Sequence, residues 1–239
     1  MTVQYDGARY SGWQRQGNTE NTIQSRIEKV ISGLLHEPVE ISGSGRTDAG
    51  VHSLGQVANF RTEQRLDCGD FLLRLNEALP GDIAVTSVSL ASPRFHARLN
   101  AKEKVYRYTI WNSPIPNVLE RRYVYQVSAP LDIQTMEDAA HLMLGTHDFK
   151  GFSTGHTKKS TIRTIKSVDI RTEGPRVELT FTGNGFLYNM VRILTGTLIE
   201  TGLGQRTPEA VLRVFETMDR QDAGFTAPPH GLCFMQVIY

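Results

Sequence analysis

The residues best placed to do chemistry lie in a glycine-rich segment at positions 43–52. The segment reads Gly-Ser-Gly-Arg-Thr-Asp-Ala-Gly-Val-His, and short apolar runs at 39–41 and 57–60 flank it. This pattern predicts a loop between two strands, whose glycines allow positive φ angles and a close approach of the backbone to a ligand. Arg46 and Asp48 stand two residues apart in this loop. The ordinary alternative is a hairpin turn in which Asp48 accepts hydrogen bonds from its own backbone.

The elements that must position this loop form a recognisable order in the first half of the chain. Asn21 and Gln24 resemble a capping box that opens a helix, and Pro38 follows its end. The expected elements are a strand at 2–5, a helix at 23–34, strands on either side of the loop, a helix near 69–79 and a strand at 83–90. The order β-α-β-β-α-β is the ferredoxin-like arrangement.

The second half repeats that order. Asp132 is expected to cap a helix that Gly145 ends. The other expected elements are a strand at 105–110, a hairpin of 165–171 and 177–181, an apolar helix at 186–200, a helix opening at Thr207-Pro208 and a strand at 232–238. We therefore expect an α+β fold of two ferredoxin-like units, residues 1–92 and 93–239. Their mainly antiparallel sheets would form a central catalytic cleft.

The amino-acid composition is that of an ordinary globular protein. The chain has 239 residues, of which 39% are hydrophobic and 21% charged, and its formal net charge is +1. No apolar run approaches the roughly 20 residues of a membrane span, and no basic-then-apolar leader is visible, so we expect a cytoplasmic protein. Cys68 and Cys233 are far apart and match no metal-ligand spacing, which favours reduced thiols.

Basic residues cluster locally, although the chain has nearly equal numbers of basic and acidic residues. One group is Arg94, His96, Arg98, Lys102, Lys104 and Arg107, and the second is Lys158, Lys159, Arg163 and Lys166. Such clusters allow one positive face that could bind nucleic acid. Two solvated faces without a partner are the alternative that charge alone leaves open.

Several further short motifs occur along the chain. They are Tyr5-Asp6-Gly7, Gly12-Trp13-Gln14-Arg15-Gln16, Leu79-Pro80-Gly81-Asp82-Ile83, Phe95-His96-Ala97-Arg98, Tyr106-Arg107-Tyr108, His147-Asp148-Phe149 and the run from Asn184 to Arg192. Together with Gly45 to His52, these strings resemble the tRNA pseudouridine synthase A family. The resemblance covers nearly the whole chain.

The resemblance implies an isomerase that converts uridines 38, 39 and 40 of the tRNA anticodon arm to pseudouridine. It further implies a homodimer that holds the tRNA. No cofactor is expected, because nothing is oxidised or transferred. Asp48 would be the nucleophile, and attack on uracil C6 or on ribose C1′ both remain open.

Arg192 would be the cationic partner of Asp48, because a carboxylate shielded from water needs one to stay ionised. It lies in the apolar stretch from Phe186 to Leu194, where a buried arginine requires a carboxylate or several carbonyls. The resemblance assigns it the pairing with the nucleophile. The alternative is an arginine that extends from the helix to solvent.

Tyr106 shares one face of its strand with Tyr108, and both tyrosines could simply be core residues. The resemblance makes Tyr106 the active-site tyrosine, stacked on the target base. Its transfer of the C5 proton is less favoured, because a phenol with a pKa near 10 is a weak base.

A uridine inside a stem must be flipped out to react. The resemblance assigns Arg46 to the gap that the uridine leaves, and it assigns RNA contacts to Phe95, His96, Ala97, Arg98, Leu99, Lys158 and Lys159. Basic residues there would bind phosphates, so shape would drive recognition.

Other functions fit the sequence less well. A non-catalytic RNA-binding protein would need a Lys/Arg-Gly-Phe-like strand, which is missing here. A phosphate loop would continue with Gly-Lys-Ser/Thr, and His52 has no second ligand at metal spacing, so we expect no metal. A synthase that acts on a different RNA remains open.

Overall fold

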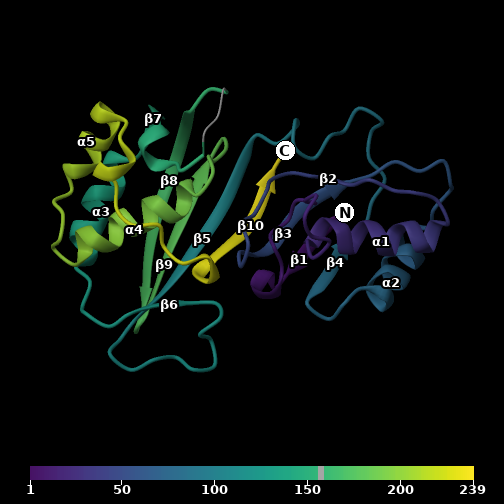
Figure 1. Ribbon diagram of the computed structural model, residues 1–239, viewed down its shortest axis with the longest axis horizontal. Helices are drawn as coiled ribbons and strands as arrows, with labels where there is room; N and C mark the ends of the chain where they lie inside the picture. The colour runs from purple at the N-terminus through teal and green to yellow at the C-terminus, as the bar shows by residue number, and fades with distance from the viewer. Residues whose placement is uncertain (156–158) are drawn as a thin grey trace. The chain divides into compact units, whose positions relative to one another are not determined.

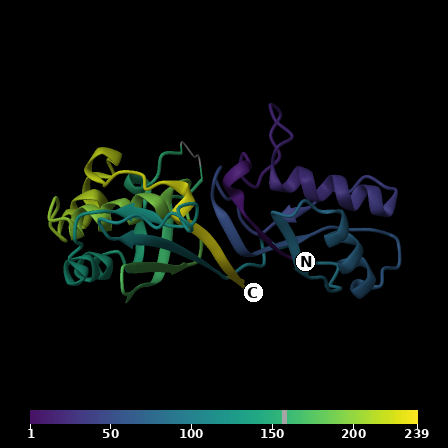
Figure 2. The ribbon, with the colours of Figure 1, turned by 90° about the horizontal axis from the view of Figure 1, so that it is seen from below.

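A computed structural model describes residues 1–155 and 159–239 (Figure 1). The chain forms two compact units, one of Met1–Lys102 with Cys233–Tyr239 and the other of Glu103–Leu232. Both chain ends therefore lie in the first unit (Figure 2). The sequence predicted a division between residues 92 and 93, with the last strand in the second unit. The first unit instead takes in residues 93–102 and the C-terminal strand, which pairs in parallel with a strand of that unit.

The first unit has the expected β-α-β-β-α-β order. Its elements are β1 (Thr2–Tyr5), α1 (Ile23–Leu35), β2 (Ser42–Gly43), β3 (His52–Asn59), α2 (Cys68–Ala78) and β4 (Ile83–Ser87). β1 pairs antiparallel with both β3 and β4, and β2 pairs antiparallel with β3. The C-terminal strand β10 (Leu232–Ile238) joins β3 in parallel through Cys233 and Phe234.

The core of this unit joins its helices to β1. Ile23, Ile27 and Ile31 recur at helical spacing on α1 and are fully buried. They belong to one apolar cluster with Phe71 and Leu75 of α2 and with Val3 of β1. Thr22, rather than Asn21, caps α1, because its side-chain oxygen accepts the amide of Ser25 at 3.2 Å.

The second unit contains a sheet in the order β5-β9-β8-β7. Its elements are β5 (Glu103–Asn112), β6 (Tyr125–Val127), α3 (Ile133–Leu142), β7 (Gly145–Asp148), β8 (Ile162–Glu173), β9 (Arg176–Gly183), α4 (Met190–Gly202) and α5 (Ala210–Thr217). The pairs within that order are antiparallel, and β6 adds to β5 in parallel. The predicted hairpin is confirmed as β8 and β9, and the α+β fold class is confirmed for both units.

Three local expectations in the second unit were wrong. Gly145 opens β7 instead of ending a helix, and α3 ends at Leu142 with Met143 as its C-cap. The apolar helix starts at Met190 and not at 186, because Asn189 before it has a left-handed backbone with φ of 60°. α5 begins at Ala210, after the predicted Thr207-Pro208 start. Of the helices that the structure describes, none has the length and apolarity to cross a bilayer.

Candidate active site

Asp48 lies in the loop between β2 and β3 and is partly buried. Its carbonyl accepts the amide of Val51 at 3.2 Å, so residues 48–51 form a turn. The preceding residue, Thr47, is buried, and its hydroxyl lies 2.8 Å from the hydroxyl of Tyr5 in β1. Residues 48–51 are therefore a turn that is anchored to the sheet directly beside Asp48.

A second segment, which contains Gly12 and Trp13, also holds the loop of Asp48. The amide of Trp13 donates to the carbonyl of Thr47 at 3.0 Å. Gly12 has a φ of +90°, and a Cβ on it would lie 2.6 Å from the Thr47 carbonyl oxygen and 3.2 Å from the carbonyl carbon of Asp48. Only glycine permits both this backbone conformation and this approach. The two strings of the sequence thus fold against each other.

The buried side chain of Gln56 in β3 holds the start of the loop. Its Oε1 accepts the hydroxyl of Ser44 at 2.6 Å and the amide of Gly45 at 3.3 Å, and its Nε2 donates to the carbonyl of Gly45 at 2.8 Å. The glycine-rich loop therefore has a defined shape on both sides of Arg46.

Arg46 is exposed, and its Nε donates to Oε1 of Gln14 at 3.1 Å. Arg46 and Asp48 thus share one loop in the first unit, as the sequence predicted. The role of Gln14 was missed. Its place in the string Gly12 to Gln16 was the available signal.

His52 is buried at the start of β3 beside Asp6. Its Nδ1 lies 3.0 Å from the Asp6 carboxylate and 3.2 Å from the amide nitrogen of Gly7. This one nitrogen donates to Asp6 when it carries the ring proton and accepts from Gly7 when it does not, so it makes only one of the two bonds in a given tautomer. Within residues 1–155 and 159–239, no group of three or more His, Cys, Asp or Glu side chains is placed to hold a metal ion.

Tyr106 belongs to β5 in the second unit and is 7% exposed. It lies opposite Phe181 of β9, and its ring meets that of Phe186 edge-on at 5.3 Å between centroids. Tyr108 is fully buried, and its hydroxyl donates to the carbonyl of Pro228 at 2.8 Å. Burial raises the pKa of Tyr108, so that its phenol stays neutral.

Arg192 lies in the first turn of α4 and is partly buried. Its Nε donates to the carbonyl of Ala227 at 2.7 Å, and its Nη1 donates to Oδ1 of Asn189 at 2.8 Å. Asn189 in turn donates through Nδ2 to the hydroxyl of Thr154 at 2.8 Å. The guanidinium is held against the protein on two sides, unlike an arginine that simply extends to solvent.

The segment from Phe95 to Leu99 is anchored at its middle. Ala97 is buried, its amide donates to Oδ1 of Asn59 at 2.8 Å, and its carbonyl accepts the Tyr239 hydroxyl at 2.8 Å. The ring of Phe95 packs against Tyr239. His96 is partly exposed, and Arg98 and Leu99 are exposed.

The second predicted RNA-contacting position is described only in part. Lys159 is exposed. The prediction for Lys158 lies outside the described residues.

Comparisons with known proteins extend over most of the chain. A family model described as tRNA pseudouridine synthase matches residues 1–99 and 139–239. The chain is 49% identical over 226 residues to a tRNA pseudouridine synthase A from Bacillus sp. (strain KSM-64), covering 94% of this chain and 93% of the relative. It is 45% identical over 240 residues to a tRNA pseudouridine synthase A from Acetivibrio thermocellus, covering 100% of this chain and 98% of the relative. A tRNA pseudouridine synthase A 2 from Clostridium perfringens is 44% identical over the same lengths of both chains.

Proposed function

This chain belongs to the tRNA pseudouridine synthase family, and from that premise we propose that it isomerises uridines 38, 39 and 40 of the tRNA anticodon stem-loop, with Asp48 as the nucleophile. The observation that carries the assignment of Asp48 is the anchoring of its loop. Bonds from Trp13 to Thr47 and between Tyr5 and Thr47 support the backbone next to Asp48. A nucleophile held this way needs little reorganisation to meet its substrate.

The reaction is an isomerisation that needs no oxidant, reductant or second substrate. The bond from ribose C1′ to uracil N1 breaks, a bond from C1′ to C5 forms, the C5 proton leaves, and N1 takes up a proton. Asp48 forms a transient covalent bond to C6 or to C1′ and is released at the end. Both points of attack remain in the proposal.

Arg192 and Tyr106 complete the proposed catalytic set. Arg192 would keep the Asp48 carboxylate ionised, and this role is supported by the two bonds that hold its guanidinium in one orientation. Tyr106 would stack on the uracil ring, and its burial and its edge-on contact with Phe186 support a fixed ring position.

RNA recognition is proposed to rest on shape and phosphate contacts. Arg46 would fill the gap that the flipped uridine leaves, and Arg98 and Lys159 would bind phosphates. The exposure of these three side chains is consistent with such contacts. The segment from Phe95 to Leu99 would bind the RNA backbone beside them. The enzyme would act as a homodimer in the cytoplasm.

The decisive experiment incubates the protein with unmodified tRNA and maps pseudouridine chemically. Product at positions 38, 39 and 40 is expected from the wild type, and Asp48→Asn should abolish it while tRNA binding persists. Asp67→Asn is the matched control: Asp67 caps α2, a position where asparagine serves equally well, and its activity should be unchanged. Pseudouridine formed by the Asp48→Asn variant would show that Asp48 is not the nucleophile. Pseudouridine at other tRNA positions would show that uridines 38, 39 and 40 are not the target.

The rival functions separate in two further measurements. An RNA containing 5-fluorouridine should form a stable or slowly released adduct with an enzyme, whereas a binding module forms none. Modification maps of cells with and without the gene would reveal a synthase that acts on another RNA.

A further inference from the structure

We propose that Gln14 is a positioning residue of this synthase, which orients the Arg46 guanidinium toward the RNA. A buried pair on α1, Gln24 and Glu28, holds Gln14 in turn. The inference rests on the proposed function, because that function gives Arg46 its task at the flipped uridine.

The direct contact is the bond from Nε of Arg46 to Oε1 of Gln14. Both side chains are exposed, and an exposed arginine otherwise samples many rotamers. The bond engages Nε–H, one of the five N–H donors of the guanidinium, and so fixes the plane of the group through its inner edge. A neutral amide oxygen does this without cancelling the positive charge that a phosphate requires.

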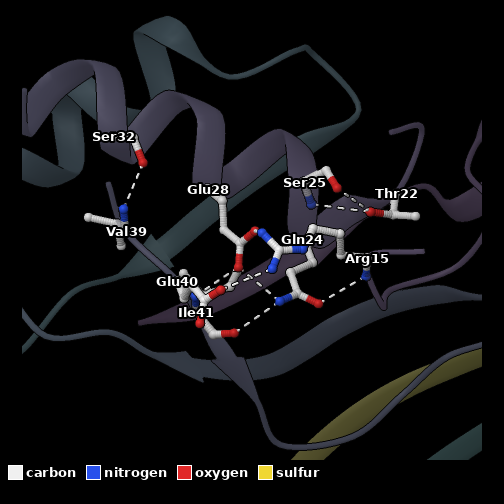
Figure 3. Close-up of polar contacts among 9 residues, drawn as sticks. All are labelled: Arg15, Thr22, Gln24, Ser25, Glu28, Ser32, Val39, Glu40 and Ile41. Atoms are coloured by element: carbon white, nitrogen blue, oxygen red, sulfur yellow. Dashed lines mark hydrogen bonds and ion pairs between the residues drawn. The ribbon is translucent and has the colours of Figure 1, made fainter. Parts of the chain in front are cut away.

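The residue after Gln14 is tied to α1. The backbone amide of Arg15 donates to Oε1 of Gln24 at 3.0 Å (Figure 3). The Arg15 guanidinium donates to Oε2 of Glu28 at 3.4 Å and to Oε1 of Glu40 at 2.9 Å. Both the backbone and the side chain of Arg15 are therefore fixed, which determines where the adjacent Gln14 stands.

The same pair on α1 holds the strand that leads into the loop of Arg46. Oε1 of Glu28 accepts the amide of Ile41 at 2.9 Å, and Nε2 of Gln24 donates to the carbonyl of Ile41 at 3.2 Å. Gln24 also donates to Oε1 of Glu28 at 2.8 Å (Figure 3). Both side chains are buried, so these bonds are made away from water.

The buried pair thus adds a second tie between two arms of the chain, which the bond from Trp13 to Thr47 also joins. One arm carries Gln14, and the other continues from Ile41 through β2 to Arg46. Loss of the pair would weaken the restraint on both arms, and we expect the effect at the bond between Gln14 and Arg46, since both of these side chains are exposed.

The first test does not depend on catalysis. The Nε–H signal of Arg46 would be identified by its loss in Arg46→Lys, in nitrogen-15 spectra at mildly acidic pH. Gln14→Met, which keeps the length of the side chain without its oxygen, should shift or broaden that signal. Gln16→Met is the matched control, because Gln16 is an exposed glutamine of the same string whose amide donates to the carbonyl of Ser11. Gln24→Met should also shift the signal, although it contacts neither residue. An unchanged signal in Gln14→Met would overturn the proposal.

The second test is a double-mutant cycle on kcat/KM with tRNA. Gln14→Met should lower kcat/KM roughly tenfold in the wild-type background, the value of a hydrogen bond to a charged group. In the Arg46→Ala background it should cause no further loss, because its effect passes through Arg46. The same loss in both backgrounds, or no loss in either, would overturn the proposal. A wild type that forms no pseudouridine would instead refute the proposed function, and the spectra would still decide the orientation of Arg46.

Discussion

Asn189 accepts a hydrogen bond of 2.8 Å from Nη1 of Arg192, three residues later in the chain. It does so from a left-handed backbone with φ of 60°, immediately before the first residue of α4. Its Nδ2 also donates to Thr154. A side chain outside the helix thereby sets the direction of an arginine inside it.

Replacing Asn189 with glycine should keep the left-handed backbone at this position and remove the hydrogen bond to Arg192. Glycine adopts a positive φ without strain, so the free energy of unfolding should change by less than about 1 kcal/mol. The bond to Arg192 is lost, and kcat should fall roughly tenfold, since a hydrogen bond to a charged group is worth about 1.5 kcal/mol or more. Urea unfolding and single-turnover kinetics measure the two quantities.

The control for that variant is His36→Gly. His36 also has a left-handed backbone, with φ of 53°, at the end of α1. Its replacement should leave kcat at the wild-type value. Equal kcat values in the two variants would show that Asn189 does not act through Arg192.

Gly12→Ala should damage the loop of Asp48 more than it damages the fold. The added Cβ would stand 2.6 Å from the carbonyl oxygen of Thr47, in addition to the strain of φ at +90°. The loop must then move, and a displacement near 1 Å can lower kcat about 100-fold. The free energy of unfolding should fall by about 2 kcal/mol or more.

Gly204→Ala supplies the comparison for backbone strain alone. Gly204 has φ of +69°, and in the part of the chain that the structure describes no atom beyond its chain neighbours lies within 4 Å of a Cβ built on it. Its replacement should cost about 1 kcal/mol of stability and leave kcat unchanged. If Gly12→Ala retained wild-type kcat, the close approach between the two segments would have no role in catalysis.

The sequence predicted elements well where the signal was local and periodic. The apolar spacing of Ile23, Ile27 and Ile31 marked α1, and the turn at residues 173–175 marked the hairpin of β8 and β9. The predicted ends of helices were less accurate where the backbone conformation of a single residue determines where the helix starts. The apolar periodicity around Asn189 does not reveal its left-handed conformation, so the start of α4 was predicted too early.

The candidate site divides in the same way. Arg46 and Asp48 could be proposed because they lie in one short glycine-rich segment, to which the family resemblance adds their roles. The string Gly12 to Gln16 marked Gln14 as a candidate, but its bond to Arg46 could not be predicted, because no local periodicity encodes a pairing over 32 positions of sequence. The pairing of β10 with β3 was missed for the same reason, since it joins residues 181 positions apart, such as Ser53 and Phe234.

Glu28 should be among the most costly polar side chains to remove. Its buried carboxylate accepts bonds from Gln24, from the amide of Ile41 and from Arg15. Glu28→Ala would leave the buried amide of Ile41 without this acceptor and would take one acceptor from Gln24 and one from Arg15, so the free energy of unfolding should fall by about 3 kcal/mol or more. Urea unfolding at neutral pH measures it.

Glu40→Ala is the counterpart on the surface. Glu40 accepts from the same Arg15 at 2.9 Å, but its side chain is 80% exposed. Its removal should change the free energy of unfolding by less than about 1 kcal/mol. Similar losses in the two variants would mean that burial does not determine the value of these ion pairs.

Asp82 should make the first unit sensitive to acid. Its carboxylate accepts the hydroxyl of Tyr10 at 2.5 Å and the guanidinium of Arg9 at 2.6 Å. Burial opposes ionisation of this carboxyl, but the bonds from Tyr10 and Arg9 outweigh it and hold the pKa of Asp82 below its usual 3.8. Because the folded pKa is the lower one, the stabilisation is complete above about pH 4 and is lost as the pH falls through the folded pKa.

Asp82→Asn removes this titration, since an amide does not ionise. The free energy of unfolding of the wild type should decrease as the pH falls below about 4, and the decrease should be smaller in the variant. Tyr10→Phe should have an intermediate slope, because Arg9 still holds the carboxylate. Urea titrations at a series of pH values provide the slopes. Parallel curves for wild type and Asp82→Asn would place the acid sensitivity in other carboxylates, and the bonds around Asp82 would then have the same strength for both of its protonation states.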